Sequence, residues 1–373
     1  MIYLDHGATS FPKPPAVSKA MLRALETCAN PGRGGHRAAL QAMETVYRCR
    51  EQASALFDCK PEQEVFTSNC THGLNIAIRT LVKPGSRVVI SGFEHNAVTR
   101  PLHLLGARVT VAGRKLFDPT DTLAEFEKAL SKGADAAVFT HVSNVFGYIL
   151  PVEEMAKLCR RYGVPFAVDA AQSAGMLPVS LEKWGADFIA MPGHKGLLGP
   201  QGTGILLCGR SPDPLIAGGT GSVSLQQAMP SELPDRAEAG TLNVPGIAGL
   251  CAGIQCVRRM GIGNLLSREQ RAARECVRML ERKGFRVFAG EDQSGTVSFV
   301  PTCDCEAMAQ RLAQKGIAVR AGLHCAPLAH ESAGTVETGT VRVSFGHDAG
   351  SFQITLLEQV LREGKFEQIE NYL

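Results

Sequence analysis

A lysine inside a turn rich in glycine and proline is the first residue whose setting suits chemistry. Lys195 lies in MPGHKGLLGPQGTG (191–204), directly after an apolar stretch typical of a buried strand. Burial lowers the pKa of a lysine and makes it a good Schiff-base former. A solvated loop lysine is the common alternative, and the flanking His194 and glycines count against it. The sequence therefore favours Lys195 as a covalent catalyst.

An aspartate lies one predicted strand before that lysine. Asp169 ends the apolar segment 165–169 and precedes Lys195 by 195 − 169 = 26 residues. In open α/β sheets, ligands bind at the carboxyl ends of the strands. Pyridoxal-5′-phosphate (PLP) needs one carboxylate against its pyridinium nitrogen to keep the ring electron-poor. Asp169 alone could equally cap the next helix, so the pair with Lys195 carries the prediction of PLP.

Two further segments follow predicted strands. NCTHGLN (69–75) has the composition of a helix start, where free N–H groups and the helix dipole suit a phosphate, although Thr71 and Gly73 are also ordinary capping residues. His95, in GFEHNA (92–97), is placed to stack on an aromatic ring or to move a proton. A lone histidine in a loop is more often merely solvated.

Among the 12 cysteines, Cys325 has the setting most typical of a reactive thiol. It follows Arg320 and His324 in RAGLHCAP (320–327), and positive neighbours lower the pKa of a thiol. A buried structural thiol remains the alternative, and we expect that fate for most of the other cysteines. No CxxC pair occurs, and CDC (303–305) is too tight for zinc, so no metal site is predicted.

An arginine lies inside the alternating segment TVRVSF (340–345). Arg342 could hold a substrate carboxylate through two parallel hydrogen bonds, or it could form an ion pair on the surface.

Composition limits the classes of function. The 373 residues are 45% hydrophobic and 20% charged, and the 39 basic and 36 acidic residues leave a net charge of +3. This balance argues against binding to nucleic acid or to a membrane surface. The start of the chain lacks the features of a signal peptide, and no apolar run approaches the ~18 residues of a membrane span. We expect a cytoplasmic protein.

The order of elements predicts the fold class. Short apolar segments alternate with amphipathic ones such as 151–162, which predicts an α/β fold with a mostly parallel sheet of seven strands between helices. The expected strands are 64–67, 87–91, 108–112, 136–140, 165–169, 188–191 and an antiparallel one near 203–207. Beyond residue 245, helices at 246–260, 264–283, 306–314 and 351–363 and strands at 296–300, 318–320 and 340–344 predict a smaller α+β domain. We expect a large domain of residues 16–245 and a small one of 1–15 plus 246–373.

Taken in order, these segments resemble the class V aminotransferase superfamily and, within it, the cysteine desulfurase and selenocysteine lyase family. The likeness runs from Tyr3 to Ser344. Its most specific parts are HVSNVFG (141–147), VDAAQS (168–173), GHKGLLGPQGTG (193–204), EAGT (238–241) and RAGLHCAP (320–327). The resemblance implies a PLP-dependent transferase of fold type I, and the short distance from Cys325 to Arg342 is typical of the SUF branch.

The resemblance also implies roles for single residues. Around PLP it implies Lys195 as the Schiff-base lysine and base at the substrate Cα, Asp169 at the pyridinium nitrogen, Gln172 at the phenolic oxygen, His95 stacked on the ring, Thr71 and His194 at the phosphate, Thr241 reaching in from the second subunit of a homodimer, and Asn144 near cofactor and substrate. Arg342 would hold the substrate carboxylate. Cys325 would attack the sulfur of L-cysteine, which releases alanine and leaves a persulfide.

Some residues depart from the family pattern. Pro192 stands where the SUF branch usually has a serine, which removes a hydroxyl near the phosphate, and Cys70-Thr71-His72 replaces the usual Thr-Thr-Glu. Alternatives to a desulfurase are a selenocysteine lyase, another PLP-dependent lyase or aminotransferase, and a non-catalytic scaffold that binds a sulfur-transfer partner. The sulfur acceptor is not defined by the sequence; a carrier protein, an iron–sulfur assembly scaffold and a thiol reductant all fit.

Overall fold

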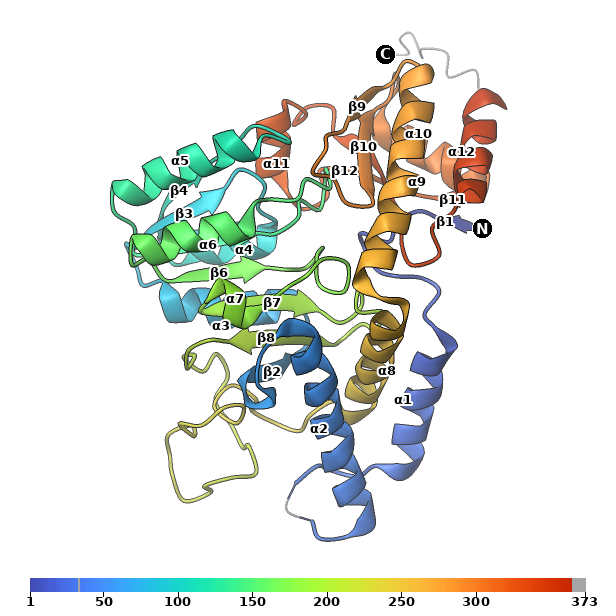
Figure 1. Ribbon diagram of the computed structural model, residues 1–373. Coiled ribbons are helices and arrows are strands. Elements are labelled where there is room, and N and C mark those ends of the chain that lie inside the picture. Colours follow the sequence, from blue (N-terminus) through green and yellow to red (C-terminus); the bar gives the residue numbers. More distant parts are fainter. Residues whose placement is uncertain (33, 364–373) are drawn as a thin grey trace, which may run out of the picture.

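A seven-stranded sheet forms the centre of the larger part of the molecule (Figure 1). The computed structural model describes residues 1–32 and 34–363. The strand order is β2–β8–β7–β6–β5–β3–β4. The strands are β2 (Glu64–Thr67), β3 (Arg87–Ser91), β4 (Arg108–Ala112), β5 (Ala136–Thr140), β6 (Phe166–Asp169), β7 (Phe188–Pro192) and β8 (Gly204–Cys208). Of these seven, β8 alone runs antiparallel to its neighbours, which confirms the predicted sheet and its reversed strand.

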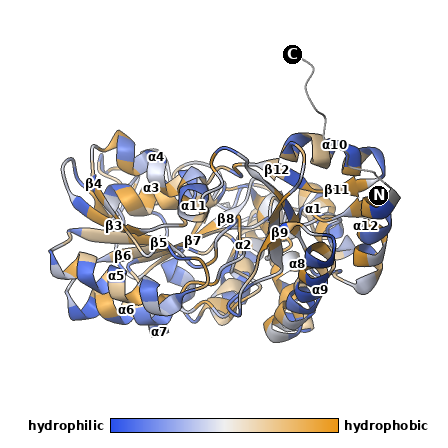
Figure 2. Ribbon diagram, turned by 90° about the horizontal axis from the view of Figure 1, so that it is seen from above, coloured by the Kyte–Doolittle hydropathy of each residue, from blue (hydrophilic) through white to orange (hydrophobic). Residues whose placement is uncertain are grey.

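Helices cover both faces of this sheet, because its strands bury side chains on both sides. Along β5, Ala136 and Val138 point to one apolar layer and Ala137 and Phe139 to the other, as the two-residue period of a strand requires. In Figure 2, α3 (Cys70–Leu81) and α4 (Asn96–Leu104) lie on one face of the sheet, and α5 (Pro119–Ser131), α6 (Val152–Arg161) and α7 (Leu181–Trp184) lie on the other. The first two helices cover the first apolar layer and the other three cover the second.

A smaller antiparallel sheet of order β12–β13–β10–β9 lies beside the large one. Its strands are β9 (Arg286–Phe288), β10 (Thr296–Val300), β12 (Arg320–Gly322) and β13 (Thr340–Ser344). A separate parallel pair joins β1 (Ile2–Tyr3) to β11 (Ile317–Ala318). The single strand predicted at 318–320 is therefore wrong: the chain changes partner at Val319, with β1 on one side and β13 on the other.

The remaining helices connect and cover the two parts. They are α1 (Pro15–Thr27), α2 (Arg37–Phe57), α8 (Val244–Met260), α9 (Ile262–Arg282), α10 (Cys305–Gln314), α11 (Pro327–Ala333) and α12 (Ser351–Glu363), with a 3-10 turn at Pro61–Gln63. Helix α8 supports the loop after β7 closely, since a Cβ at Gly253 would clash with the carbonyl of Leu197. Among the helices of the described residues, none is long and apolar enough to cross a membrane.

Candidate active site

Five loops meet at the carboxyl edge of the large sheet and enclose a pocket. Parallel strands place their carboxyl ends at one edge, so residues far apart in sequence converge there. The pocket is lined from the loops after β2, β3, β5, β6 and β7, by Asn69, Cys70, Thr71, His95, Ala97, Thr140, Val142, Asn144, Asp169, Ala171, Gln172, Pro192, His194 and Lys195. The structure thus brings together seven of the eight residues predicted to hold the cofactor.

Lys195 lies in the turn after β7, as predicted. The turn is fixed by backbone hydrogen bonds: Gly193 N–H donates to Thr203 at 2.8 Å, and Leu198 N–H donates to the carbonyl of Lys195 at 2.9 Å. Burial and the charge of Arg342 lower the pKa of Lys195, and the carboxylate of Asp169 only partly offsets them. A larger fraction of this amine is therefore neutral near pH 7 than of an exposed lysine, which is what reaction with an aldehyde requires.

Asp169 ends β6 with only 3% of its surface exposed. Its Oδ1 accepts hydrogen bonds from Ala171 N at 2.8 Å and from the Cys70 thiol at 3.4 Å. Burial, followed by the Asp169 charge, raises the pKa of Cys70 well above its usual value, so this thiol is a protonated donor. The first contact belongs to a turn, and no helix follows directly in the described residues, since α7 begins at Leu181 with Ser180 as its cap; the alternative of a helix cap is therefore wrong, and Asp169 lines the pocket.

The residues predicted to contact the phosphate and the ring lie at helix starts. Helix α3 begins at Cys70 after the cap Asn69, whose Oδ1 accepts from His72 N at 2.9 Å, and Thr71 is exposed in its first turn. His95 caps α4 by accepting from Ala97 N through Nδ1 at 3.0 Å. Burial lowers the pKa of His95, so its ring is neutral at pH 7. The predicted helix start is confirmed, and His95 is half-buried rather than freely solvated.

His194 and Gln172 connect the pocket to the N-terminal segment. His194 Nδ1 is 3.0 Å from the Thr9 hydroxyl, and its carbonyl accepts from the Lys13 ammonium at 2.7 Å. Burial lowers the pKa of His194 to about 4. Gln172 Nε2 donates to the carbonyl of Gly7 at 3.0 Å. Sequence reasoning missed this segment, because no local pattern shows that residues 7–13 return to a loop near residue 194.

Thr241 does not line the Lys195 pocket of its own chain. It is exposed in the long connection between β8 and α8, where it borders a neighbouring cavity together with His72 and Asn243. The role predicted for Thr241, in the phosphate site of a second subunit, stays a prediction.

Cys325 is exposed in the loop between β12 and α11. His324 and Cys325 have φ of 50° and 57°, a left-handed conformation that is strained for residues other than glycine. Two asparagines hold this loop by its backbone: Asn96 N–H donates to the carbonyl of Cys325 and Asn144 Nδ2 donates to that of His324, both at 2.8 Å. Asn96 follows His95, and Asn144 lines the pocket, so the cysteine loop is fixed against the pocket rim.

The interpretation of His324 as a positive neighbour of this thiol is wrong. The imidazole Nε2 contacts the Thr340 hydroxyl at 3.1 Å, and burial lowers the pKa of His324 to about 2, so the ring is neutral. Arg320 pairs with Asp5, with Nε and Oδ2 3.2 Å apart. Local sequence could not show that both side chains have partners elsewhere.

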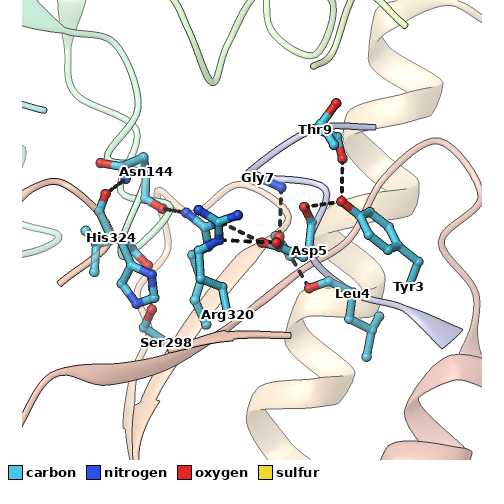
Figure 3. Close-up of polar contacts among 12 residues, drawn as sticks. Tyr3, Leu4, Asp5, Gly7, Thr9, Asn144, Ser298, Arg320 and His324 are labelled. Atoms are coloured by element: carbon cyan, nitrogen blue, oxygen red, sulfur yellow. Dashed lines mark hydrogen bonds and ion pairs between the residues drawn. The ribbon is translucent and has the colours of Figure 1, made fainter. Parts of the chain in front are cut away.

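Arg342 is a buried residue with 2% of its surface exposed, so the alternative of a surface ion pair is wrong. Its Nη2 donates to Asp5 Oδ1 at 2.8 Å and its Nη1 to the carbonyl of Asn144 at 2.9 Å. Its Nε is buried without a partner in the described residues. Arg320 lies directly opposite it on β12, and Figure 3 shows Asp5 reaching Arg320 from the N-terminal segment. Asp5 was missed because it is 337 residues from Arg342.

The residues fit PLP. The pocket offers an amine with a lowered pKa and a buried carboxylate, two of the groups that hold this cofactor. The first turn of α3 suits a phosphate. Asn144 also lines the pocket, and its buried Oδ1 has no hydrogen-bond partner in the described part of the chain.

The fold and site define a class of protein: an α/β enzyme with a lysine, an aspartate and a histidine around one pocket at the edge of its sheet. The chain belongs to the aminotransferase class-V family, which matches residues 2–357 and implies PLP as cofactor.

The curated relatives and solved structures agree. A "probable cysteine desulfurase" of Pyrococcus abyssi is 34% identical over 365 residues, covering 92% of this chain and 89% of the relative. One of Methanothermobacter thermautotrophicus is 33% identical, covering 97% and 94%. The apo structure of a cysteine desulfurase from Thermococcus onnurineus has a TM-score of 0.90 at 33% identity, covering 97% and 94%. The cysteine desulfurase CsdA of Escherichia coli has a TM-score of 0.84 at 26% identity, with the same coverage.

Proposed function

We propose that this chain is a PLP-dependent cysteine desulfurase that converts L-cysteine to L-alanine and collects the sulfur as a persulfide on Cys325. One observation carries the proposal: an exposed cysteine is fixed by Asn96 and Asn144 at the rim of the pocket that holds Lys195 and Asp169. A transamination or an elimination would need no such thiol. Similarity to cysteine desulfurases over most of the chain supports the same conclusion.

The pocket residues would divide the work of holding the cofactor. Lys195 would bind it covalently, Asp169 would contact the ring nitrogen, Gln172 the phenolic oxygen and His95 the ring face. Thr71 and His194 would hold the phosphate, and Pro192 contributes no hydroxyl there. When bound, PLP supplies an electron sink that stabilises negative charge at the substrate Cα.

The remaining steps belong to protein side chains. Neutral Lys195 takes the Cα proton, and Arg342 binds the substrate carboxylate through its unpartnered Nε while Asp5 and the Asn144 carbonyl keep the guanidinium in place. The Cys325 thiolate attacks the substrate sulfur. A new S–S bond forms, the substrate C–S bond breaks, and its electron pair stays with carbon. Protonation of that carbon gives alanine, and the sulfur remains on Cys325.

We propose a homodimer, in which Thr241 of one subunit completes the phosphate site of the other. An apolar surface on α1 and α2 supports it: Leu22, Leu25, Leu40, Met43 and Tyr47 are all more than two-fifths exposed. A partner surface that covered them would remove this apolar area from water. We also propose the division into residues 16–245 and 1–15 plus 246–373. The β1–β11 pairing favours grouping the N-terminus with the small sheet, and residues 364–373 lie outside the described structure.

Product analysis tests the proposed function. PLP-loaded protein is incubated with L-cysteine and dithiothreitol, and alanine and sulfide are quantified together. Equal amounts of both are expected. Pyruvate or another keto acid in place of alanine would indicate a different PLP reaction. Turnover of selenocysteine without turnover of cysteine would indicate a selenocysteine lyase, and protein that never binds PLP would indicate a scaffold.

A further inference from the structure

Two histidines and an aspartate meet where the first turn of the chain packs against the loop after β13. His6 Nε2 is 3.2 Å from Asp348 Oδ1. One nitrogen of His6, one nitrogen of His347 and one oxygen of Asp348 all lie within 4.8 Å of one another. The two imidazole rings are 6.0 Å apart and nearly perpendicular. Three potential ligand atoms from opposite ends of the chain therefore face one small space.

These histidines are poorly satisfied by the protein itself. His6 is 6% exposed, and within the described residues neither of its ring nitrogens has an aligned hydrogen bond. The Nδ1 of His347 is also buried without a partner among the same residues. Leaving buried polar atoms unpaired costs free energy, and such groups in native proteins call for an explanation. The contact with Asp348 accounts for the Nε2 of His6, but not for its Nδ1 or for the Nδ1 of His347.

A small cavity borders the cluster. His6 and His347 line it together with Glu269 of α9, and Gln172 and Lys195 form walls that it shares with the active-site pocket. Glu269 is 6% exposed, and in the described part of the chain no hydrogen bond or ion pair holds its carboxyl group. The cavity thus brings two imidazoles and one carboxyl group together with Lys195 and apolar side chains such as Met176 and Phe345.

We propose that His6, His347 and Asp348 form a binding site for a divalent transition-metal cation of the Zn²⁺ type. Imidazole nitrogens and a carboxylate oxygen are ordinary zinc ligands, and three of them leave a fourth position for water. Bonds of about 2.0–2.1 Å in a tetrahedron put neighbouring ligand atoms about 3.3 Å apart. The 3.2 Å between His6 Nε2 and Asp348 Oδ1 already matches this spacing. The site does not depend on the proposed desulfurase activity.

A bound cation would also affect the stability of the fold. The cation would tie the N-terminal turn to the end of β13, the two segments that carry Asp5 and Arg342. Binding to the folded state alone would stabilise it by mass action.

The direct test is titration of metal-free, fully reduced protein with Zn²⁺ in a calorimeter, followed by X-ray absorption at the zinc edge. We expect one equivalent per chain and a shell of nitrogen and oxygen at about 2.0–2.1 Å. Because the chain has 12 cysteines, sulfur at about 2.3 Å would show that thiolates hold the ion and would overturn the proposal. Absence of saturable binding would overturn it too.

Variants separate this site from adventitious binding. His6 is buried against Tyr3, so the sharper changes are His347→Ala and Asp348→Asn, at a half-buried and an exposed position. Each is expected to weaken Zn²⁺ binding by more than about tenfold, with an unchanged circular dichroism spectrum. The exposed His103, changed to alanine, is the matched control and should leave the affinity as it is. Equal affinity in all three variants and the wild type would contradict the assignment.

Discussion

The pocket at the sheet edge and the loop that carries Cys325 are built in opposite ways. The pocket residues stand directly after strands, and Asp169 and His95 are held by hydrogen bonds to their own chain neighbours. The Cys325 loop has an exposed side chain and left-handed backbone, and hydrogen bonds from two asparagines outside the loop hold its carbonyls. Its position depends on contacts with the other region.

The difference matches two kinds of chemistry. A cofactor needs a rigid, partly dehydrated setting in which the amine and the carboxylate keep fixed positions. A thiol that accepts sulfur and passes it on must also reach a second partner outside the protein. Cys325 is exposed, as its proposed role requires, while its carbonyl is bound to Asn96 N–H beside the pocket.

The largest effect should come from the pocket. Lys195→Ala removes the group proposed to bind the cofactor and to take the Cα proton, so desulfuration should fall by at least about 10³-fold. The visible absorbance that PLP acquires on a lysine should vanish as well. Lys157→Ala, at an exposed position on α6, is the control and should match the wild type in both spectrum and activity. An unchanged spectrum in the Lys195 variant would refute its role.

Removal of the Cys325 thiol should abolish sulfur transfer without affecting PLP binding in the pocket. Cys325→Ala should abolish persulfide and alanine formation from L-cysteine, while the PLP absorbance stays, since Cys325 does not line the pocket. Cys303→Ala, at a half-buried position, should keep full activity. Desulfurase turnover by the Cys325 variant at the wild-type rate would show that the Cys325 thiol does not accept the sulfur.

Arg342 tests the contact between the regions. Arg342→Lys keeps a positive charge but loses the planar set of donors, so KM for L-cysteine should rise by about 10–100-fold, with a smaller change in kcat. The exposed Arg108, changed to lysine, serves as control. If KM stays constant, Arg342 does not bind the substrate and only connects Asp5 to Asn144 through hydrogen bonds.

A smaller effect concerns pH and the buried Glu94, whose Oε1 accepts a hydrogen bond from Thr140 N at 3.0 Å. Glu94 is fully buried, and burial raises its pKa to about 8. The folded state therefore keeps a proton that the unfolded chain loses, so stability falls as pH rises from the ordinary glutamate pKa through about 8. Glu94→Gln should raise Tm by roughly 2 °C or more above that range and by less in acid. Calorimetry against the exposed Glu62→Gln checks this, and a variant less stable at every pH would disprove the cause.

The pocket could be predicted from sequence because its signals are local. Asp169 is the last residue of β6, and Lys195 lies three residues beyond the end of β7 at Pro192, so the carboxyl edge of the sheet brings the two together. The sequence predicts the reversed β8 because the connection at 182–185 is short, and the described residues between β7 and β8 form no helix, which a parallel crossover would usually need.

The second region could not be predicted in the same detail, because its contacts join distant residues. Asp5 reaches Arg342 across the whole chain, and His324 turns toward Thr340 rather than toward the thiol beside it. Strand pairing also splits 318–320 between two sheets, which an apolar pattern in one segment does not reveal. The sequence singled out Arg342 and Cys325 there, but not the residues that they contact.

Mass spectrometry of the Cys325 peptide is the most direct test of the central claim. PLP-loaded protein is treated with L-cysteine without reductant, the thiols are blocked by alkylation, and the protein is digested. Our account predicts one additional sulfur atom on Cys325, dependent on PLP and absent from Lys195→Ala. Alanine released with the extra sulfur on another cysteine, or on none, would contradict it.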